Sequence, residues 1–339
     1  MNDEITKKVV NMYTQYPYPF VGTHNNMFKD IVLPEIMKIG NIDRILEAGC
    51  GTGNVAIEIA QLLPEIEVVA IDITKKSIEI ARSNAKKLGL KNICFKQSNL
   101  LDYDNNLGIF DFIHCQGVIH HLSSPEIGMR TINMYLKQNG FAYIWLYMLL
   151  GRKEILEVRE ILKYLVDNND ADFNYKMSVL TTVIKNINIC NNGGRHDDKP
   201  VNSKLLNNIE KGIIFIKKRG WKKFLYLLLQ KSFNIKKLAY SSKIKEIGLS
   251  DIKEIGLSDL YLHPHDVFYR MENVFELFDQ SGFSFQKIMD GMSSSLSQCF
   301  GANNEITKLA SSLPLKKQYQ LIELFEKPSG IGFLVKKEK

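Results

Sequence analysis

Cysteine is scarce in this sequence, and its spacing excludes several kinds of site. The five cysteines are scattered and form no C-x-x-C or similar ligand spacing, so no metal site is predicted: Cys50, Cys94, Cys115, Cys190 and Cys299. Because their number is odd, buried free thiols in a cytoplasmic protein are the simplest interpretation. We therefore expect a cytoplasmic location.

Long apolar runs are missing as well. No run of about 18 apolar residues occurs, so no transmembrane helix is expected. The polar start MNDEITKK is not followed by an apolar segment, and we do not expect it to be a signal peptide. With 339 residues, 45% of them hydrophobic, the chain can bury the core of two domains or of one domain with a large insertion.

Between residues 44 and 150 the sequence alternates between strand-like and helix-like patterns. Short apolar segments predict strands at 44–49, 67–72, 93–97, 110–115 and 140–147. Helical spacing predicts helices between them, at 55–63, 77–88 and 125–136. Such alternation with short links implies right-handed crossovers and a parallel sheet that carries helices on both faces.

The pattern changes after residue 150. Segments such as 154–166 keep a helical spacing, and strand patterns return only at 283–290 and 331–337. The sequence therefore predicts a largely helical insertion after the fifth strand. The expected organisation is an N-terminal strap or lid at 1–39, a cofactor-binding core at 40–150, the insertion at 151–265 and the C-terminal part of the core sheet at 266–339. The insertion is expected to contribute to the substrate site or its lid, or to serve an interaction.

A glycine-rich loop follows the first predicted strand. It has the pattern E-x-G-x-G-x-G from Glu47 to Gly53 and opens a helix. Glycines at such a turn let the backbone bend tightly and approach a ligand. Asp72 ends the next strand, 23 positions after Gly49, where a carboxylate can accept both hydroxyls of a ribose. The sequence thus predicts a nucleoside-binding site.

The loop departs from the dinucleotide pattern G-x-G-x-x-G. Its third glycine would stand at position 54, which is Asn54. Glu47 would repel a pyrophosphate, whereas it suits a ligand that carries an ammonium group. This charge argument favours a nucleoside with an amino-acid part over a dinucleotide.

Several segments together resemble the class I S-adenosylmethionine-dependent methyltransferases. ILEAGCGTGN resembles their motif I, VVAIDIT the acidic loop that follows, and FDFIHCQGVIHHL the fourth-strand motif. SNLLDY stands where the family usually has an acidic residue that binds the adenine amino group, and this chain has Asn99 there. Residues assigned to the cofactor are Glu47, Gly49, Cys50, Gly51, Gly53, Asp72, Ile73, Asn99, Leu100 and Gln116.

The resemblance implies an α/β, Rossmann-like fold. Its sheet would have seven strands, mostly parallel, with helices on both faces and a last antiparallel strand, for which 331–337 is the candidate. The cofactor would be S-adenosylmethionine. The resemblance covers residues 40–150 well and 270–338 loosely, and it does not extend to the insertion.

The acceptor of the methyl group is less defined than the cofactor. No Asn-Pro-Pro-Tyr run and no Pro-Cys pair follow the fourth strand, which speaks against amide or exocyclic-amine methylation of that type and against cytosine C5. His120 and His121 follow that strand at the carboxyl end of the sheet and are the candidate catalytic residues. The alternative is that the pair only begins a helix.

Two further groups are candidates for contact with the substrate. Tyr13, Tyr16 and Tyr18 precede the fold in YTQYPYPF, and His263, His265 and Tyr269 lie where the chain returns from the insertion. The first segment could instead be a strap packed on the surface. A metal bound by the two histidines is not favoured, because no further ligand is evident in the sequence.

One segment is strongly basic. Residues 211–245 contain eleven Lys or Arg and no Asp or Glu, and the whole chain carries a net charge of +7. Such a segment can bind an anionic membrane surface or a nucleic acid, or it can pack an apolar helix face on the core with its lysines in water. A homodimer is a further alternative that the sequence leaves open.

The favoured function is transfer of a methyl group to an oxygen or nitrogen nucleophile of a small molecule or of a protein side chain. An RNA methyltransferase is the alternative enzyme. A non-catalytic cofactor-binding interaction protein is the alternative of another class, and the intact Gly49, Gly51, Gly53 and Asp72 argue against it.

Overall fold

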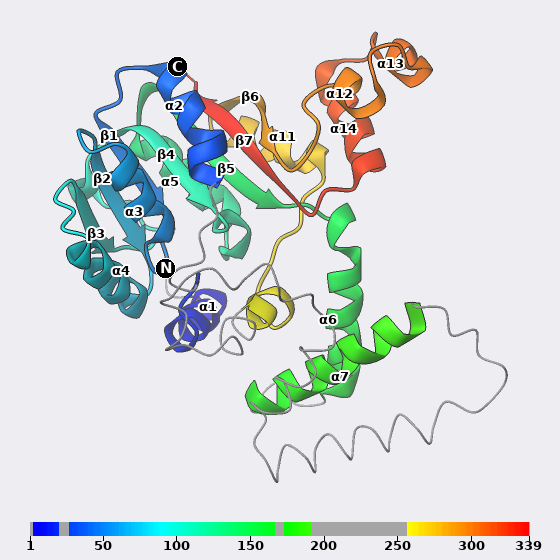
Figure 1. Ribbon diagram of the computed structural model, residues 1–339, viewed down its shortest axis with the longest axis horizontal. Coiled ribbons are helices and arrows are strands. Elements are labelled where there is room, and N and C mark those ends of the chain that lie inside the picture. The colour runs from blue at the N-terminus through cyan, green and yellow to red at the C-terminus, as the bar shows by residue number, and fades with distance from the viewer. Residues whose placement is uncertain (1–2, 20–26, 167–172, 192–255, 339) are drawn as a thin grey trace. The chain divides into compact units, whose positions relative to one another are not determined.

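The chain divides into two compact units. The computed structural model describes residues 3–19, 27–166, 173–191 and 256–338 (Figure 1). One unit comprises Met1–Lys153 and Pro264–Lys339, and the other comprises Glu154–His263. Each unit is described by itself below.

The first unit is built on a seven-stranded sheet with the order β3-β2-β1-β4-β5-β7-β6 (Figure 1). Its strands are β1 (Arg44–Ala48), β2 (Glu67–Asp72), β3 (Ile93–Gln97), β4 (Phe110–Gln116), β5 (Leu136–Tyr147), β6 (Phe283–Asp290) and β7 (Gly330–Lys337). The first five are parallel, and β7 pairs antiparallel with both β5 and β6. The predicted sheet and its antiparallel last strand are confirmed.

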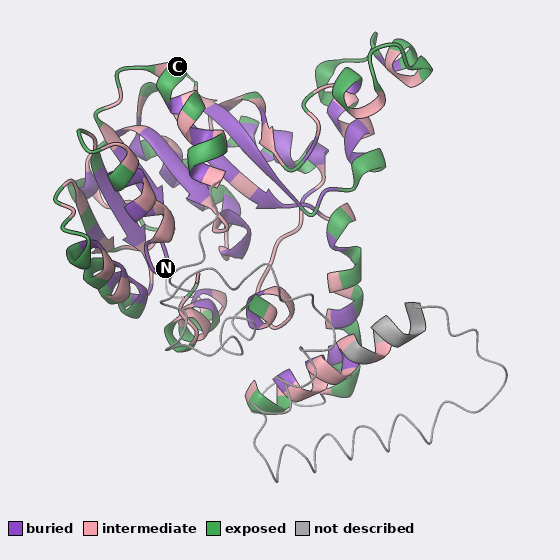
Figure 2. Ribbon diagram, viewed as in Figure 1, coloured by how far each residue is buried: buried purple, intermediate pink, exposed green. Residues whose placement is uncertain are grey.

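Helices cover both faces of this sheet. Apolar residues of one face pack on η1 (Phe28–Val32), α2 (Leu33–Ile39), α3 (Asn54–Leu62) and α4 (Lys75–Lys87). The other face packs on α5 (Pro125–Tyr135), α11 (Met271–Gln280) and α14 (Leu315–Glu326). β1, β2 and β4 lie in the middle of the sheet and are mostly buried, and Figure 2 shows them largely in purple.

Short elements complete this unit. They are α1 (Glu4–Gln15), η2 (Asn105–Leu107), η3 (Ile119–His121), η4 (Leu150–Arg152), α12 (Leu296–Phe300) and α13 (Glu305–Ala310). Helices α12, α13 and α14 lie between β6 and β7 in the chain, where the sequence analysis made no prediction. Their buried side chains extend the apolar core under α11.

The second unit is helical, as predicted for the segment after β5. It contains α6 (Lys153–Leu165), α7 (Phe173–Asn191) and a helical turn at 256–261. Val158, Leu162 and Leu180 belong to its small apolar core, and Arg159 donates hydrogen bonds to the carbonyl of Leu260. The basic segment 211–245 lies outside the described residues. None of the helices in the described ranges is both long and apolar enough to cross a membrane.

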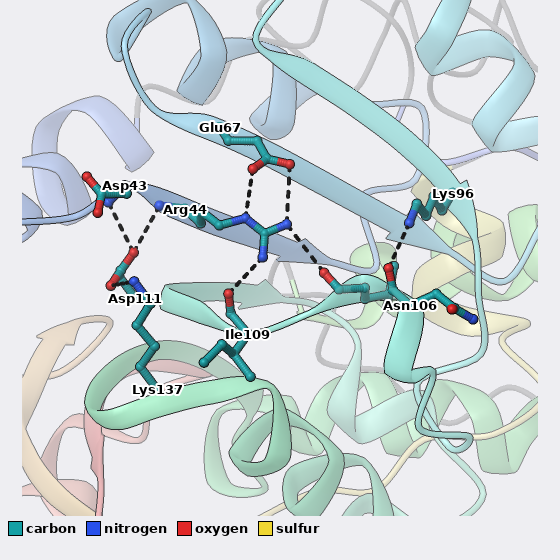
Figure 3. A network of polar contacts seen from close by, with 9 residues as sticks. Asp43, Arg44, Glu67, Lys96, Asn106, Ile109, Asp111 and Lys137 are labelled. Atoms are coloured by element: carbon teal, nitrogen blue, oxygen red, sulfur yellow. Dashed lines mark hydrogen bonds and ion pairs between the residues drawn. The ribbon is translucent and has the colours of Figure 1, made fainter.

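A polar network joins the amino ends of four strands (Figure 3). The Arg44 guanidinium binds the Glu67 carboxylate, with 2.7 Å between Nε and Oε2, and donates to the carbonyl of Ile109. Asp111 accepts hydrogen bonds from the backbone N–H groups of Asp43 and Arg44, and its other oxygen lies 2.6 Å from Lys137 Nζ. The network holds β1 against β2 and β4 at the edge opposite the ligand-binding edge.

Replacing Asp111 with Asn should lower the free energy of unfolding by about 1.5–3 kcal/mol at pH 7, the range for hydrogen bonds to a charged group. Burial alone would raise the pKa of Asp111, but hydrogen bonds from Lys137, Arg44 and Asp43 lower it overall. A carboxyl with a lowered pKa stabilises the fold above its unfolded value of about 3.9 and loses this contribution as the pH falls further.

Denaturant unfolding at several pH values checks this prediction. The difference between wild type and Asp111→Asn should be full at pH 7 and should shrink below about pH 4. Asp279→Asn is the matched control, because Asp279 is exposed and pairs with exposed Lys316. A difference that persists unchanged into strong acid would contradict the electrostatic account.

Candidate active site

The glycine loop is fixed to the end of β2. Backbone N–H groups of Gly49 and Cys50 both donate to the Ile71 carbonyl at 2.8 Å, and that of Gly51 donates to Asp72 Oδ2 at 2.9 Å. Gly49, Gly51 and Gly53 all have positive φ, a conformation that favours glycine. The predicted tight turn at the carboxyl edge of the sheet is therefore present.

Side chains are sterically excluded from this loop. A Cβ added at Gly49 would lie 2.2 Å from Val118 Cγ2, and one at Gly51 would lie 2.1 Å from the Tyr18 carbonyl oxygen. Gly117, at the end of β4, also has positive φ, but no described atom lies within 4 Å of a Cβ added there. The glycine loop is thus closely packed against Val118 and Tyr18, and within the described residues Gly117 has no such neighbour.

Asp72 lies at the carboxyl end of β2 with both oxygens engaged. Oδ2 accepts from Gly51, and Oδ1 accepts from the backbone N–H and the hydroxyl of Thr74 at 2.8 and 2.6 Å. Burial raises the pKa of Asp72, and these hydrogen bonds oppose the rise. Each carboxylate oxygen can accept more than one hydrogen bond, so the group can still bind ribose hydroxyls.

The other predicted cofactor residues line up along the same edge. The Ile73 carbonyl accepts from Gln97, Leu100 is buried, and Gln116 ends β4 with its Nε2 3.9 Å from Met27 Sδ. Asn99 uses its side-chain carbonyl to accept from the Leu101 N–H at 3.0 Å. Its contact with adenine stays a prediction, since an amide oxygen has a second lone pair.

Two cofactor candidates, Cys50 and Glu47, are buried. Burial, reinforced by the charges of Asp72 and Glu47, raises the pKa of the Cys50 thiol well above its usual value, so Cys50 contributes backbone rather than thiolate chemistry. Glu47 is 3% exposed, and its Oε2 lies 2.8 Å from His114 Nδ1. The sequence analysis missed His114, because nothing in a strand pattern marks a histidine as the partner of a glutamate on another strand.

The N-terminal strap contacts the glycine loop directly. The Tyr18 carbonyl accepts from the Thr52 N–H at 3.2 Å, and the Pro19 carbonyl accepts from the Thr52 hydroxyl. The Tyr18 side chain is 41% exposed. These contacts place 18–19 beside the predicted cofactor loop, as a strap over the site requires.

Helix α1 is anchored to the loop that carries the histidine pair. Asp3 caps the helix by accepting from the Thr6 N–H at 2.7 Å, and it also accepts from the Ser123 hydroxyl at 2.7 Å. These hydrogen bonds, the one from Thr6 first, lower the pKa of Asp3 to about 2. The Tyr13 ring meets the His121 ring edge-on, with centroids 6.2 Å apart. Tyr16 follows the helix as its C-cap.

His121 forms a close pair with Asp266. Its Nδ1 lies 2.6 Å from Asp266 Oδ1, and the two side chains are 6% and 0% exposed. The Val267 N–H donates to the His120 carbonyl at 2.8 Å, which holds the segment after the insertion against η3. The sequence analysis did not assign Asp266 to the site, although this acid directly follows His265.

His120 is enclosed by aromatic rings. Its ring stacks on the Tyr147 ring with centroids 3.6 Å apart and also contacts Trp145. The guanidinium carbon of Arg152 lies 3.2 Å from the centroid of the same Tyr147 ring. His120 itself is 0% exposed. This packing supports a structural role for His120 and leaves His121 as the better catalytic candidate.

The remaining predicted substrate residues, His263, His265 and Tyr269, do not all lie beside His121. The His265 carbonyl lies 3.5 Å from His121 Nδ1. Tyr269 pairs through its backbone with Tyr147, its side chain is buried, and burial raises the pKa of its hydroxyl. His263 is buried in the second unit. Substrate contact stays a prediction for all three.

Comparison with known proteins identifies the family. A family model described as a methyltransferase domain matches residues 40–214. An uncharacterized protein of Synechococcus sp. is 24% identical over 339 residues, covering 96% of this chain and 70% of the relative. The release factor glutamine methyltransferase of Aliivibrio fischeri is 30% identical over 122 residues, covering 34% of this chain and 43% of the relative.

A solved structure shares the fold. PKMT2 from Rickettsia typhi in complex with AdoHcy aligns with a TM-score of 0.56 at 16% identity, over 88% of this chain and 49% of that protein. The chain thus spans about half the length of that protein. Because the family model covers more than half of the sequence, the chain belongs to the methyltransferase-domain family, as a class I S-adenosylmethionine-dependent methyltransferase.

The described residues fit this cofactor. The glycine turn is tied to β2, and Asp72 places a carboxylate at the end of that strand. Among the described residues, none lies within 4 Å of a Cβ added at Gly117, directly after β4. When bound, S-adenosylmethionine supplies a methyl group on a sulfonium, and the protein has to orient and desolvate the nucleophile.

Replacing Thr52 with Val should raise the Kd for S-adenosylmethionine about two- to tenfold. The change removes the hydroxyl that donates to Pro19 and keeps the side-chain volume, and one hydrogen bond contributes about 0.5–1.5 kcal/mol. Thr307→Val is the control, because it removes a similar hydroxyl-to-carbonyl bond to Gly301. Equal affinity of both variants and wild type would show that the strap does not support the cofactor site.

Proposed function

We propose that the chain transfers a methyl group from S-adenosylmethionine to an oxygen or nitrogen nucleophile of a small molecule or of a protein side chain, with His121 as general base. The observation that carries the proposal is the buried pair of His121 and Asp266, 2.6 Å apart, immediately after β4. In open α/β sheets, ligands bind at the carboxyl ends of the strands, which is where this pair lies.

The pair has the arrangement of an oriented base. Asp266 Oδ1 lies 2.6 Å from Nδ1 of His121. In this proposal the carboxylate holds the imidazole ring with the proton of the neutral form on Nδ1, which leaves the lone pair on Nε2. Nε2 then takes the proton of the acceptor while the acceptor attacks the methyl carbon. Asp266 stabilises the imidazolium that results. A nucleophile that must lose a proton is therefore the acceptor that this geometry suits.

Other residues take binding roles in this proposal. Asp72 accepts the ribose hydroxyls, Glu47 attracts the ammonium group, and Asn99 with Leu100 meets the adenine. Tyr16 and Tyr18 cover the site as a lid, because the strap is bonded to the glycine loop at Thr52. Closing the site excludes water, which favours methyl transfer over hydrolysis.

A screen for the acceptor tests the proposal. Cell extract is incubated with the protein and S-adenosylmethionine labelled in the methyl group, and His121→Asn is run in parallel. A label that wild type transfers to a small molecule or a polypeptide, and that the variant fails to transfer, supports the proposal. Label in RNA would favour the alternative enzyme, and cofactor binding without any transfer would favour a non-catalytic role.

A further inference from the structure

A row of polar side chains crosses the sheet beneath the cofactor loop. Glu47 on β1, His114 on β4 and Tyr143 on β5 stand side by side in the strand register, and Asp290 ends β6. Neighbouring positions in register place their side chains on the same face of a sheet. Of these four groups, only Glu47 has a role in the proposed reaction.

The contacts join the row into one network. Glu47 Oε2 lies 2.8 Å from His114 Nδ1, and the His114 ring stacks on Tyr143 with centroids 4.9 Å apart and 8° between the planes. The Tyr143 hydroxyl donates to Asp290 Oδ2 at 2.9 Å, and Asp290 Oδ1 accepts from the Gly332 N–H at 2.7 Å. A Cβ at Gly332 would lie 2.4 Å from both the hydroxyl and Asp290, so the glycine provides the space for the network.

The network places a buried carboxyl group, Glu47, against a buried imidazole, and its other carboxyl group, Asp290, is half-buried. His114 is 0% exposed and Glu47 is 3% exposed. Burial raises the pKa of Asp290, whereas the Tyr143 hydroxyl, the Gly332 N–H and the charge of His114 act in the opposite direction. Burying a carboxylate without a counter-charge is costly, and the His114 imidazole is the basic group that lies against Glu47.

Two further contacts of the network, both among the described residues, are with uncharged side chains. Phe28 of η1 meets the ring edge-on, with centroids 5.7 Å apart. Met27 Sδ lies 3.6 Å from the Tyr143 hydroxyl. Glu47, Tyr143 and Asp290 are therefore the titratable groups that face His114 from β1, β5 and β6 among the contacts described.

We propose that His114 is a positioning residue that holds the Glu47 carboxylate and releases a proton when the ammonium group of the cofactor binds beside Glu47. This rests on the proposed role of Glu47 in binding that group. The ammonium replaces the imidazolium as the counter-charge, so the two cations compete for one carboxylate. The N–H bond of the imidazolium breaks, its electron pair stays on the nitrogen, and the proton passes to the buffer.

The proposal makes cofactor affinity depend on pH. A ligand that displaces a proton binds more tightly as the pH rises, by up to about tenfold for each pH unit while His114 is protonated in the unbound protein. AdoHcy has the same ammonium group and should show the same dependence. Methylthioadenosine lacks the amino-acid part, so its affinity should not depend on His114.

Isothermal titration calorimetry between about pH 5 and pH 8 tests the proposal. Each ligand is titrated in two buffers of different ionisation enthalpy, which counts the protons released. Wild type should release up to one proton with S-adenosylmethionine and AdoHcy, and none with methylthioadenosine. His114→Gln, which can still donate to Glu47, should bind both cofactors without this release. Tyr143→Phe keeps the imidazole and should keep the release.

Two results would overturn the proposal. One is that wild type releases the same number of protons when it binds S-adenosylmethionine as when it binds methylthioadenosine. This comparison needs no variant, so it holds even if His114→Gln fails to fold. The other is an unchanged pH dependence in folded His114→Gln. Failure of the proposed function is distinguishable from both. It would appear as the absence of methyl transfer, whereas the calorimetric test measures proton release on cofactor binding and does not depend on transfer.

Discussion

Replacing His121 with Asn should lower kcat by about 10²–10⁴-fold, the usual contribution of a general base. Asn fills much of the same space and can still contact Asp266, but it cannot accept a proton near neutral pH. The Kd for S-adenosylmethionine should remain close to that of wild type, because His121 is not among the residues proposed to contact the cofactor. Steady-state kinetics with saturating acceptor, together with calorimetry, measures both quantities.

Asp266→Asn changes the carboxylate that pairs with His121. An amide at 2.6 Å can turn its N–H₂ group toward Nδ1 of His121 and favour the wrong tautomer, so kcat should fall here as well. Residues that act as a unit are not additive, and the double variant should lose little more than the worse single variant. Full turnover in either single variant would remove the pair from the reaction.

Replacing Asp72 with Ala should weaken S-adenosylmethionine binding by about 2–4 kcal/mol, which is about a 30- to 1000-fold rise in Kd. Two charge-assisted hydrogen bonds to ribose are lost, with partial compensation by water. The carboxylate also receives the Gly51 N–H and both donors of Thr74, so its removal loosens the glycine turn as well. This second effect acts in the same direction as the first.

Calorimetric titration of the variant measures the change, and circular dichroism checks that it folds. Asp279→Ala is the control for removing an acidic side chain, because Asp279 lies exposed near the end of α11. Its Kd should equal that of wild type. An unchanged Kd for Asp72→Ala would mean that the ribose does not bind at the end of β2.

The fold was predictable where local pattern and global topology agree. Strands 67–72, 93–97 and 283–290 have the predicted bounds, because apolar runs between turn residues mark buried strands. Helix α14 has an exposed apolar side, which includes Leu324 and Phe325. Its helical spacing therefore does not reveal which side of the helix packs on the rest of the unit. The position of α14 against α11 depends on tertiary packing, which the sequence pattern does not show.

The site was predictable where one loop contains the chemistry. The turn from Glu47 to Gly53 and the acid at Asp72 follow from a local motif and a strand end. The two pairs, His121 with Asp266 and Glu47 with His114, could not be predicted, because each joins residues far apart in sequence. Only the strand order and the return of the chain after the insertion bring these atoms within 3 Å of each other.

The most direct test compares two acceptors that differ only in whether the attacking atom must lose a proton at neutral pH. Once the screen has identified the acceptor, single-turnover methyl transfer is measured for both forms with wild type and His121→Asn at saturating S-adenosylmethionine. We predict that the variant loses about 10²–10⁴-fold with the protonated acceptor and little with the acidic analogue. An equal loss with both acceptors would contradict the account, because His121 would then support the site without taking the proton.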